Sequence, residues 1–428
     1  MAAIATVEAA LMTRLLVLTT RLPYPPTEGH QLRSWHLLKA LASRHEVTLM
    51  SFLRRDDEPA QAGPLRDILA ALETFPIPGE RSPIALGRAL LAGTLTNTPY
   101  LAARYASAEF RKRLRERAGQ ADLVHVDMLP LMAHADCVPD GIPLVMNAHN
   151  VEHRLLRIRA SIERRAFARA FLRHQVSRLH DFEQAACRRA DAILVCSDDD
   201  AETLRALAPG ARVQLVPNGV DVQANQPAAT QASGNRLVFV GQMGWFPNRD
   251  GVEWFLADIF PRILAVRPDT QFVLVGKSAG LEVPGRVAAN VHLPGFVSDL
   301  RPLVHDAAVY VVPLRAGSGT RLKVLEAMAL GKAIVTTRIG SEGILLQPGD
   351  DALFADEPQA FADAVLALLA DPARAHALGL AARRCAQSHY GWEGISRTAL
   401  DFYDTLLEDA PPGAHLAEAR GLPIDAVA

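Results

Sequence analysis

The sequence contains little cysteine and no long apolar run. Its four cysteines are scattered among 428 residues without a C-x-x-C pair, so zinc-site spacing is absent and a reducing compartment is favoured. No stretch approaches the roughly 20 apolar residues that span a bilayer. Residues 1–13 lack both a basic start and a long apolar core, so we expect a flexible N-terminus and not a signal peptide. These absences predict a cytoplasmic globular protein.

The chain also lacks an excess of charge of either sign. Its formal net charge is −2, so nothing global favours a nucleic-acid partner. One local exception is the arginine-rich segment 152–180, in which leucine, isoleucine and phenylalanine recur at helical spacing. Such a helix is usually a solvated face over a core. The alternative is contact with an anionic membrane surface or a lipid diphosphate.

Short β-branched and apolar runs alternate with longer amphipathic segments, which is typical of parallel sheets covered by helices. The alternation stops at 222–235, where aromatic residues and apolar periodicity are missing. We therefore predict an α/β protein of two doubly wound domains, each binding ligands beyond the carboxyl ends of its strands. The predicted parts are a flexible N-terminus (1–13), a first domain (14–221), a linker (222–235), a second domain (236–389), a helix packing back towards the first domain (390–409) and a disordered tail (410–428).

One stretch, VYVVPLRAGSGTRLKVLEAMALGK, reads as a strand, a glycine-rich loop and a helix. Glycines ahead of a helix let the backbone approach a ligand, and the free amides of the first turn favour an anion. Arg321 and Lys323 add positive charge there, and Glu326 could accept hydrogen bonds from sugar or ribose hydroxyls. The pattern predicts a phosphate site, and the alternative is a tight turn with a solvated basic face. The triplet Gly276-Lys277-Ser278 could end a Walker loop, but Gln271 stands where the first glycine of that motif should be. A Walker loop is therefore excluded.

This stretch resembles the donor-site signature of the family 4 glycosyltransferases, in which a glycine-rich loop precedes Leu-Glu-Ala-Met-Ala-x-Gly. The resemblance runs over about residues 14–406. Further segments match the family in the same order: Pro26–Gly29, Asn147–Asn150, Pro217–Asp221, Phe239–Met243, Leu274–Gly276, Gly295–Asp299 and Tyr390–Glu393. Each segment alone is a weak signal, and their order and spacing together make a strong one.

The resemblance implies a GT-B fold, with two Rossmann-like domains facing a cleft, and retaining transfer of a hexose from a nucleotide sugar. The acceptor would be a glycan or a polyprenyl-linked sugar, in bacterial exopolysaccharide or other cell-surface glycan synthesis at the inner face of the membrane. No metal or other cofactor is expected, because cationic side chains and helix-end amides stabilise the leaving diphosphate. The acidic run Asp198–Asp200 is accordingly interpreted as the start of a helix and not as a metal-binding motif. The alternatives are a nucleotide-sugar epimerase on the same fold and a non-catalytic sugar-nucleotide-binding protein.

The family's functional positions carry over onto residues of this sequence. By this resemblance Lys323 and Arg321 stabilise the departing phosphate, His149 contacts the transferred sugar and Glu326 holds the donor ribose. The remaining donor-binding positions include the segment against the base and the loops near the phosphates: Gly29, Gly241, Arg249, Phe296, Val297, Gly317, Ser318, Gly319 and Thr320.

The sequence departs from the family's pattern in two places. Ser318 stands where a glutamate is usual, so contacts to the transferred sugar must differ. Gln242 stands where an arginine is usual, and the cation expected further along is read as Arg249. The loss of cations at the second place makes Lys323 more important to the hypothesis, and both departures motivate the non-catalytic alternative.

Overall fold

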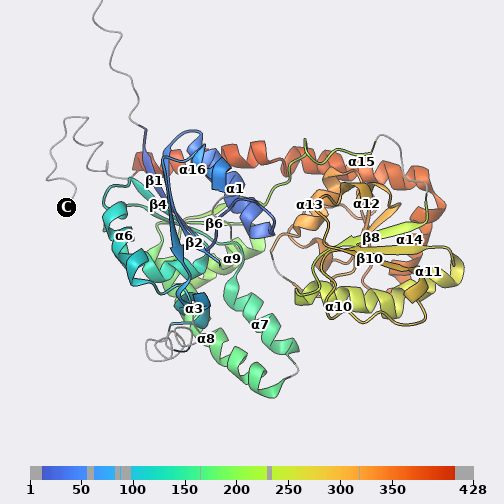
Figure 1. Ribbon diagram of the computed structural model, residues 1–428. Coiled ribbons are helices and arrows are strands. Elements are labelled where there is room, and N and C mark those ends of the chain that lie inside the picture. The colour runs from blue at the N-terminus through green and yellow to red at the C-terminus, as the bar shows by residue number, and fades with distance from the viewer. Residues whose placement is uncertain are drawn as a thin grey trace, which may run out of the picture. The chain divides into compact units, whose positions relative to one another are not determined.

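The structure is a computed structural model that describes residues 12–54, 62–81, 87, 98–163, 165–228, 234–317 and 319–409 (Figure 1). Residues 1–11 of the predicted flexible N-terminus, the predicted disordered tail (410–428) and Ser318 lie outside the described residues. The chain forms two compact units. The first runs up to Val216 and resumes at Ser396, and the second is Pro217–Ile395.

The first unit is built on a seven-stranded parallel sheet in the order β3-β2-β1-β4-β5-β6-β7. Its inner strands are almost fully buried, as expected for a parallel sheet covered on both faces. From β1 the chain adds strands outward on one side and then returns to add β4 on the other, so the switch point lies where Thr19 pairs with Asp127. The strands are β1 (Arg14–Thr19), β2 (Glu46–Leu53), β3 (Ala71–Pro76), β4 (Leu123–Asp127), β5 (Leu144–Asn147), β6 (Ala192–Val195) and β7 (Val213–Leu215).

Helices of the first unit begin where the sequence supplies caps. A reciprocal capping box between Glu28 and Gln31 opens α1, and the Ser197 hydroxyl accepts from the Asp200 amide at the start of α9. The described helices are α1 (Gly29–Ala42), α2 (Gly63–Arg66), α3 (Pro78–Arg81), α5 (Tyr100–Ala103), α6 (Ala108–Ala118), η2 (Leu129–Cys137), α7 (Glu152–Ile162), α8 (Ala166–Arg189) and α9 (Asp198–Leu207).

The second unit repeats the architecture with a six-stranded parallel sheet in the order β10-β9-β8-β11-β12-β13. Its switch point lies between β8 and β11, where Leu237 pairs with Val309. The strands are β8 (Arg236–Val240), β9 (Gln271–Val275), β10 (Val291–Gly295), β11 (Val309–Val312), β12 (Ala333–Thr336) and β13 (Leu353–Phe354). The predicted α/β class with two doubly wound sheets is therefore confirmed.

The helices of the second unit enclose a core rich in phenylalanine, valine and leucine. They are α10 (Phe246–Trp254), the π-helical turn η3 (Phe255–Ile259), α11 (Phe260–Val266), η4 (Ala288–Asn290), α12 (Arg301–His305), α13 (Leu322–Ala329), η5 (Ile339–Ser341), α14 (Pro358–Ala370) and α15 (Pro372–His389). Within the described residues no single helix has the length and apolarity of a membrane span. Taken together α14 and α15 would have both, but they are bent by 106° at their junction.

The start of the predicted linker is held on the second unit. The Arg383 guanidinium donates to the carbonyl oxygens of Val222 and Asn225, at 3.3 and 2.7 Å, and to the Gln226 side chain at 2.8 Å. Arg301 donates to the Ala224 carbonyl at 3.1 Å. The compact units accordingly divide at Val216 and Pro217, ahead of the segment 222–235.

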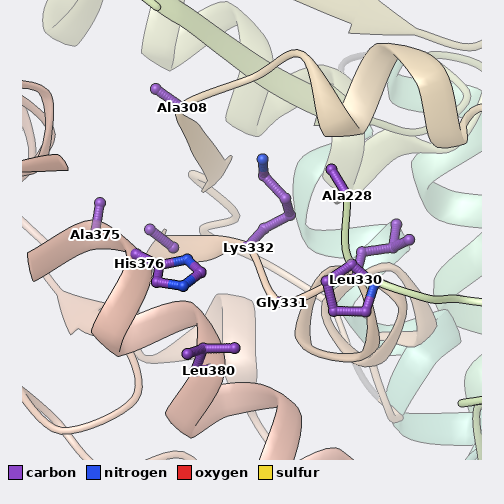
Figure 2. Close-up of a pocket in the computed structure, with 10 residues that line it drawn as sticks. Ala228, Ala308, Leu330, Gly331, Lys332, Ala375, His376 and Leu380 are labelled. Atoms are coloured by element: carbon purple, nitrogen blue, oxygen red, sulfur yellow. The ribbon is translucent and has the colours of Figure 1, made fainter. Parts of the chain in front are cut away.

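A small pocket lies beside this anchored segment, at the amino ends of β11 and β12 (Figure 2). Lys332 lines it and donates to the His305 carbonyl at 3.2 Å, and burial lowers the pKa of its amine to about 8. Ligands of doubly wound sheets bind at the opposite, carboxyl edge, so this pocket is distinct from the sites described below.

The last helix, α16 (Trp392–Asp409), belongs to both units. Its first residue packs in the second unit, where a Cβ on Gly219 would lie 2.7 Å from the Trp392 ring. Its later residues belong to the first unit, where the Tyr403 hydroxyl is hydrogen-bonded to Nδ1 of His125 and Asp404 pairs with Arg44 at 2.6 Å. Gly219 therefore has no room for a side chain, which gives a packing reason for the glycine of the Pro217–Asp221 segment.

Candidate functional site

The second unit gathers polar residues at the carboxyl edge of its sheet, beside the switch point. One loop follows β8 and begins with Gly241, and the other follows β11 and contains Gly317. Gly276, after β9, has φ +133°, and a side chain there would collide with the Gly241 carbonyl oxygen. The loops after β8 and β9 therefore pack closely because glycine lets them, at the place where doubly wound sheets bind ligands.

Lys323, in the first turn of α13, lies at the centre of this edge. Its amine donates to the Asn248 amide oxygen at 2.5 Å and stands 4.3 Å from the centroid of the Phe239 ring. A Cβ on Gly241 would lie 2.9 Å from the same amine. Burial, and then the positive charge of Arg321, lower the pKa of Lys323 to about 7. The amine is thus held in place by neutral partners, and it forms no ion pair within 4 Å among the residues that the structure describes.

Glu326 lies one helical turn beyond Lys323, where side chains share a face of α13. Burial raises the pKa of its carboxyl to about 7, although the Lys323 charge acts in the opposite direction. Burial, followed by the nearby Glu326, also raises the pKa of Tyr310 well above its usual range. The Lys323 amine and the Glu326 carboxyl therefore both change charge near neutral pH. An incoming anion would favour the protonated form of each.

Arg321 is buried and turned onto its own loop. Its guanidinium donates to the carbonyl oxygens of Gly319 and Ile339, at 2.5 and 3.3 Å, and lies 3.4 Å from a Glu342 carboxylate oxygen. A Cβ on Gly317, whose φ is +141°, would lie 2.8 Å from the same guanidinium. In this arrangement Arg321 shapes the loop, and its predicted action on a phosphate stays a prediction.

The remaining predicted donor residues of this unit make other contacts or are exposed. Arg249 donates from Nε to the Met243 carbonyl at 3.0 Å. Phe296 is 64% exposed, and Val297 packs against the core. Thr320 follows Gly319 in the loop, and α13 begins two residues later at Leu322.

Sequence reasoning missed Asn248 and Phe239, which both contact the Lys323 amine. Asn248 adjoins Arg249, and the charge of Arg249 makes it the residue that the sequence predicts to bind the donor. Phe239 lies within the matched segment after β8, but its place in a strand predicts a core residue.

The first unit gathers a second set of polar residues at its own switch point. Asp127 ends β4 and is buried, and it accepts hydrogen bonds from the Ser34 hydroxyl at 2.6 Å, the Asn147 amide at 2.6 Å and His149 Nε2 at 2.8 Å. Arg33 donates to the other side of the Asn147 amide through Nε and Nη2, at 3.1 and 2.9 Å. Although burial acts to raise it, the pKa of Asp127 is held well below its usual range by the histidines His149 and His125. Asp127 is thus a buried, ionised carboxylate that fixes the position of His149.

The loop that contains Gly29 reaches the same place. Gly29 opens α1, and the next residue, His30, has its pKa lowered to about 4 by burial and then by His149. Glu28 and Asp127 oppose this shift. Two predicted residues far apart in sequence, Gly29 and His149, therefore belong to one cluster. Sequence reasoning missed Asp127, whose signal is a carboxylate at the end of a mainly apolar strand.

Two findings bear on metals. Among the described residues, no group of three or more His, Cys, Asp or Glu side chains is arranged to hold a metal ion. The run Asp198–Asp200 begins α9, as predicted, with the Ser197 cap at its start.

Comparison with known proteins gives matches over most of the chain. Residues 28–224 match the family model described as Glycosyltransferase Family 4, and residues 234–371 match the model Glycosyl transferases group 1. The phosphatidyl-myo-inositol mannosyltransferase of Mycobacterium tuberculosis is 27% identical over 46% of this chain and 56% of its own length. The chain thus spans little more than half of that relative. The glycogen synthase of the same organism is 24% identical over 89% of this chain and 92% of its own.

Solved structures share the fold at low identity. The sucrose-phosphate synthase of Thermosynechococcus elongatus superposes with a TM-score of 0.65 at 21% identity, covering 93% of this chain and 100% of that one. HepE of Anabaena, solved in complex with UDP and glucose, gives a TM-score of 0.63 at 14% identity, covering 92% and 100%. At these identities the likeness concerns the architecture.

Proposed function

This chain belongs to the family 4 glycosyltransferases and has the GT-B fold, and on that premise we propose that it transfers a hexose from a nucleotide sugar to a glycan or lipid-linked sugar. We include in the proposal that the anomeric configuration is retained. One observation carries it: the Lys323 amine stands beside a glycine-rich loop at the start of a helix, held by neutral groups and without an ion pair to any described residue. Such a group suits a diphosphate leaving group.

In the proposed reaction, negative charge develops on the departing diphosphate as the bond to the sugar breaks. A positioned amine and the amides at the start of α13 would stabilise that charge without reorganising. Removing one such donor typically lowers turnover by about 10²–10³-fold. Because Asn248 and Phe239 already hold the Lys323 amine, little ordering is needed when the diphosphate enters.

The other predicted residues take supporting roles in the same proposal. Glu326, on the same helix face, accepts hydrogen bonds from the donor ribose. Phe296 is exposed and available to lie against the base, with Val297 beside it. His149 contacts the transferred sugar, and Gly29 leaves room for the donor or acceptor near it.

We further propose that no metal takes part, because the amine and the helix-end amides supply the charge stabilisation that a cation would otherwise give. Treatment of the purified protein with EDTA is then expected to leave transfer unchanged. A loss of transfer that added Mg²⁺ or Mn²⁺ restores would contradict this part of the proposal.

The setting we propose is assembly of a cell-surface polysaccharide in the cytoplasm, at the inner face of the membrane. A polyprenyl-linked acceptor lies at that interface, and the arginine-rich segment 152–180 is the part of the sequence suited to an anionic surface. HepE, which shares the fold, was solved with UDP and glucose, so UDP-sugars are the first donors to test.

The test begins with the nucleotide. Melting temperatures are measured with UDP, GDP, ADP and their sugars, because a ligand that binds the native state raises the melting temperature. Transfer is then followed with the stabilising donor and a panel of acceptors. Lys323→Ala is expected to lower transfer about 100-fold or more with the fold retained. Lys332→Ala is the matched control, since Lys332 is a second buried lysine with a lowered pKa at the opposite edge of the same sheet.

Near-normal turnover by Lys323→Ala would contradict the assignment. Release of an epimerised sugar or nucleotide sugar without any acceptor would favour the epimerase. Calorimetric binding of a nucleotide sugar without turnover across the panel would favour a non-catalytic binder.

A further inference from the structure

A helical hairpin projects from the first unit and leaves two phenylalanines in solvent. It is formed by α7 and α8, which pack against each other (Figure 1). Phe167 is 94% exposed and Phe171 is 48% exposed. They lie four residues apart on α8, so they occupy the same face one turn apart. Large aromatic side chains are seldom left so exposed unless they meet a partner.

Along α8 the exposed residues are separated from the buried ones. In α8 the buried side chains begin at Gln175 and continue with Leu179 and Glu183, towards the end that packs on η2 and α9. Residues 166–174 include no buried side chain. We call 157–161 and 165–174 the hairpin tip. The core of the unit therefore accounts for the second half of α8 and leaves the aromatic face of the tip unexplained.

The hairpin is strongly basic, whereas the chain as a whole is not. The sequence 152–180 contains eight arginines and two glutamates, while the whole chain has a net charge of −2. Arg154 pairs with Asp199 at 2.7 Å. The described tip contains five further arginines, and none of them has an ion-pair partner among the described residues: Arg157, Arg159, Arg165, Arg169 and Arg173.

We propose that the hairpin tip docks on an anionic lipid bilayer. Phe167 and Phe171 enter the boundary between headgroups and acyl chains, and the unpaired arginines contact lipid phosphates while their stems cover apolar surface. Exposed aromatic and cationic groups on one short hairpin are complementary to such a surface in both polarity and charge. A soluble acidic protein would complement the charge of the arginines, but it would not by itself supply an apolar environment for the exposed Phe167 side chain.

Docking of the hairpin tip on a bilayer would also bring the first unit close to a lipid-linked acceptor. The helix α7 begins three residues after His149 and has 11 residues, so the tip stands roughly 16 Å from the start of the helix. The docked hairpin would hold the carboxyl edge of the first unit within reach of a lipid-linked sugar. This use of the surface rests on the proposed function, whereas binding to lipid does not.

The experiment measures co-sedimentation of the full chain with phosphatidylcholine vesicles, with and without phosphatidylglycerol. The unaltered protein is expected to sediment with the anionic vesicles and to be released as salt is raised. The double variant Phe167→Ala, Phe171→Ala is expected to bind about tenfold or more weakly. The double variant Arg165→Gln, Arg173→Gln is expected to bind about tenfold more weakly and to show a smaller salt dependence, because two of the five unpaired arginines are removed.

Matched controls come from exposed residues of the second unit. Val266 is 67% exposed and apolar, and Arg374 is exposed, so Val266→Ala with Arg374→Gln is expected to bind like the unaltered protein. The proposal is overturned if the unaltered protein ignores anionic vesicles, binds neutral ones equally well, or if the tip variants bind as the controls do.

Transfer to a water-soluble acceptor separates this proposal from the function. The tip variants are expected to keep that activity and to lose activity on a lipid-linked acceptor embedded in vesicles. Loss of vesicle binding with full activity on both acceptors would overturn the role of docking in presenting the acceptor.

Discussion

Affinity for a nucleoside diphosphate is expected to fall steeply as pH rises above 7. The pKa of the free Lys323 amine is lowered to about 7, so at pH 9 roughly one molecule in a hundred has it charged. A bound diphosphate favours the charged amine and returns its pKa towards its ordinary value of about 10.4. Binding above pH 7 therefore takes up a proton, and affinity should fall about tenfold per pH unit, or about 1.4 kcal/mol.

Two other groups also change charge near pH 7, the ligand phosphate and the Glu326 carboxyl, and each has a definite effect on the affinity. Phosphate oxygens lose their last proton near pH 6, so above pH 7 the ligand gains little further charge. The pKa of Glu326 is raised to about 7, so its carboxyl becomes negative over the same range and also opposes an anion. Between pH 7, where half of the amine is charged, and pH 9 we expect Lys323 alone to lower the affinity about 50-fold.

The assay is isothermal titration calorimetry with the nucleotide that gives the largest rise in melting temperature. Titrations at pH 8 in two buffers with different ionisation enthalpies count the protons taken up, and about 0.9 is expected. Lys323→Met removes the titrating amine with little change in length. It should bind weakly at every pH and show no steep slope above pH 7. A flat profile for the unaltered protein, or the same slope in Lys323→Met, would refute the reasoning.

Three further substitutions test the packing around the two sites. Gly241→Ala places a methyl group 2.9 Å from both the Lys323 amine and the buried Phe239 ring, so nucleotide affinity measured by calorimetry should fall about tenfold and the melting temperature should fall as well. Unaltered affinity would contradict the geometry. Asp127→Asn removes the charge that holds His149, and transfer should fall about tenfold or more with nucleotide affinity unchanged; full turnover would remove His149 from its proposed role. Tyr403→Phe breaks a buried hydrogen bond of α16, and denaturant titration should give a free energy of unfolding lower by about 1–2 kcal/mol; an unchanged midpoint would mean that this bond adds nothing.

The sequence predicted the position of the second-unit cluster because that position follows from topology. A parallel sheet with a switch point after β8 brings the loops beginning at Gly241 and containing Gly317 to one edge, whatever their side chains. Which side chain meets Lys323 could not be predicted in the same way. Asn248 and Arg249 are adjacent on α10, and one residue on a helix turns the side chain by about 100°. Charge favoured Arg249, whereas the helical phase directs Asn248 towards the amine.

The contacts that hold the start of the linker could not be predicted from the sequence either. Its composition predicts a loop, and residues 222–228 are indeed without helix or strand. What holds the segment is a guanidinium more than 150 residues away, that of Arg383, which bonds to Val222 and Asn225. Contacts of this kind depend on the folded unit and leave no local pattern. The two compact units accordingly divide several residues before the compositional break.

The two switch-point clusters differ in charge, and this difference gives a way to separate their roles. Around Lys323 the titrating amine is held by neutral groups and is suited to an anion. Around His149 the fixed charge is the negative Asp127, which suits hydroxyl donors and a sugar ring that becomes cationic as its bond breaks. Lys323→Met should therefore weaken both nucleotide binding and transfer, whereas Asp127→Asn should weaken transfer alone. If both variants weakened binding equally, the two clusters would not divide the reaction in this way.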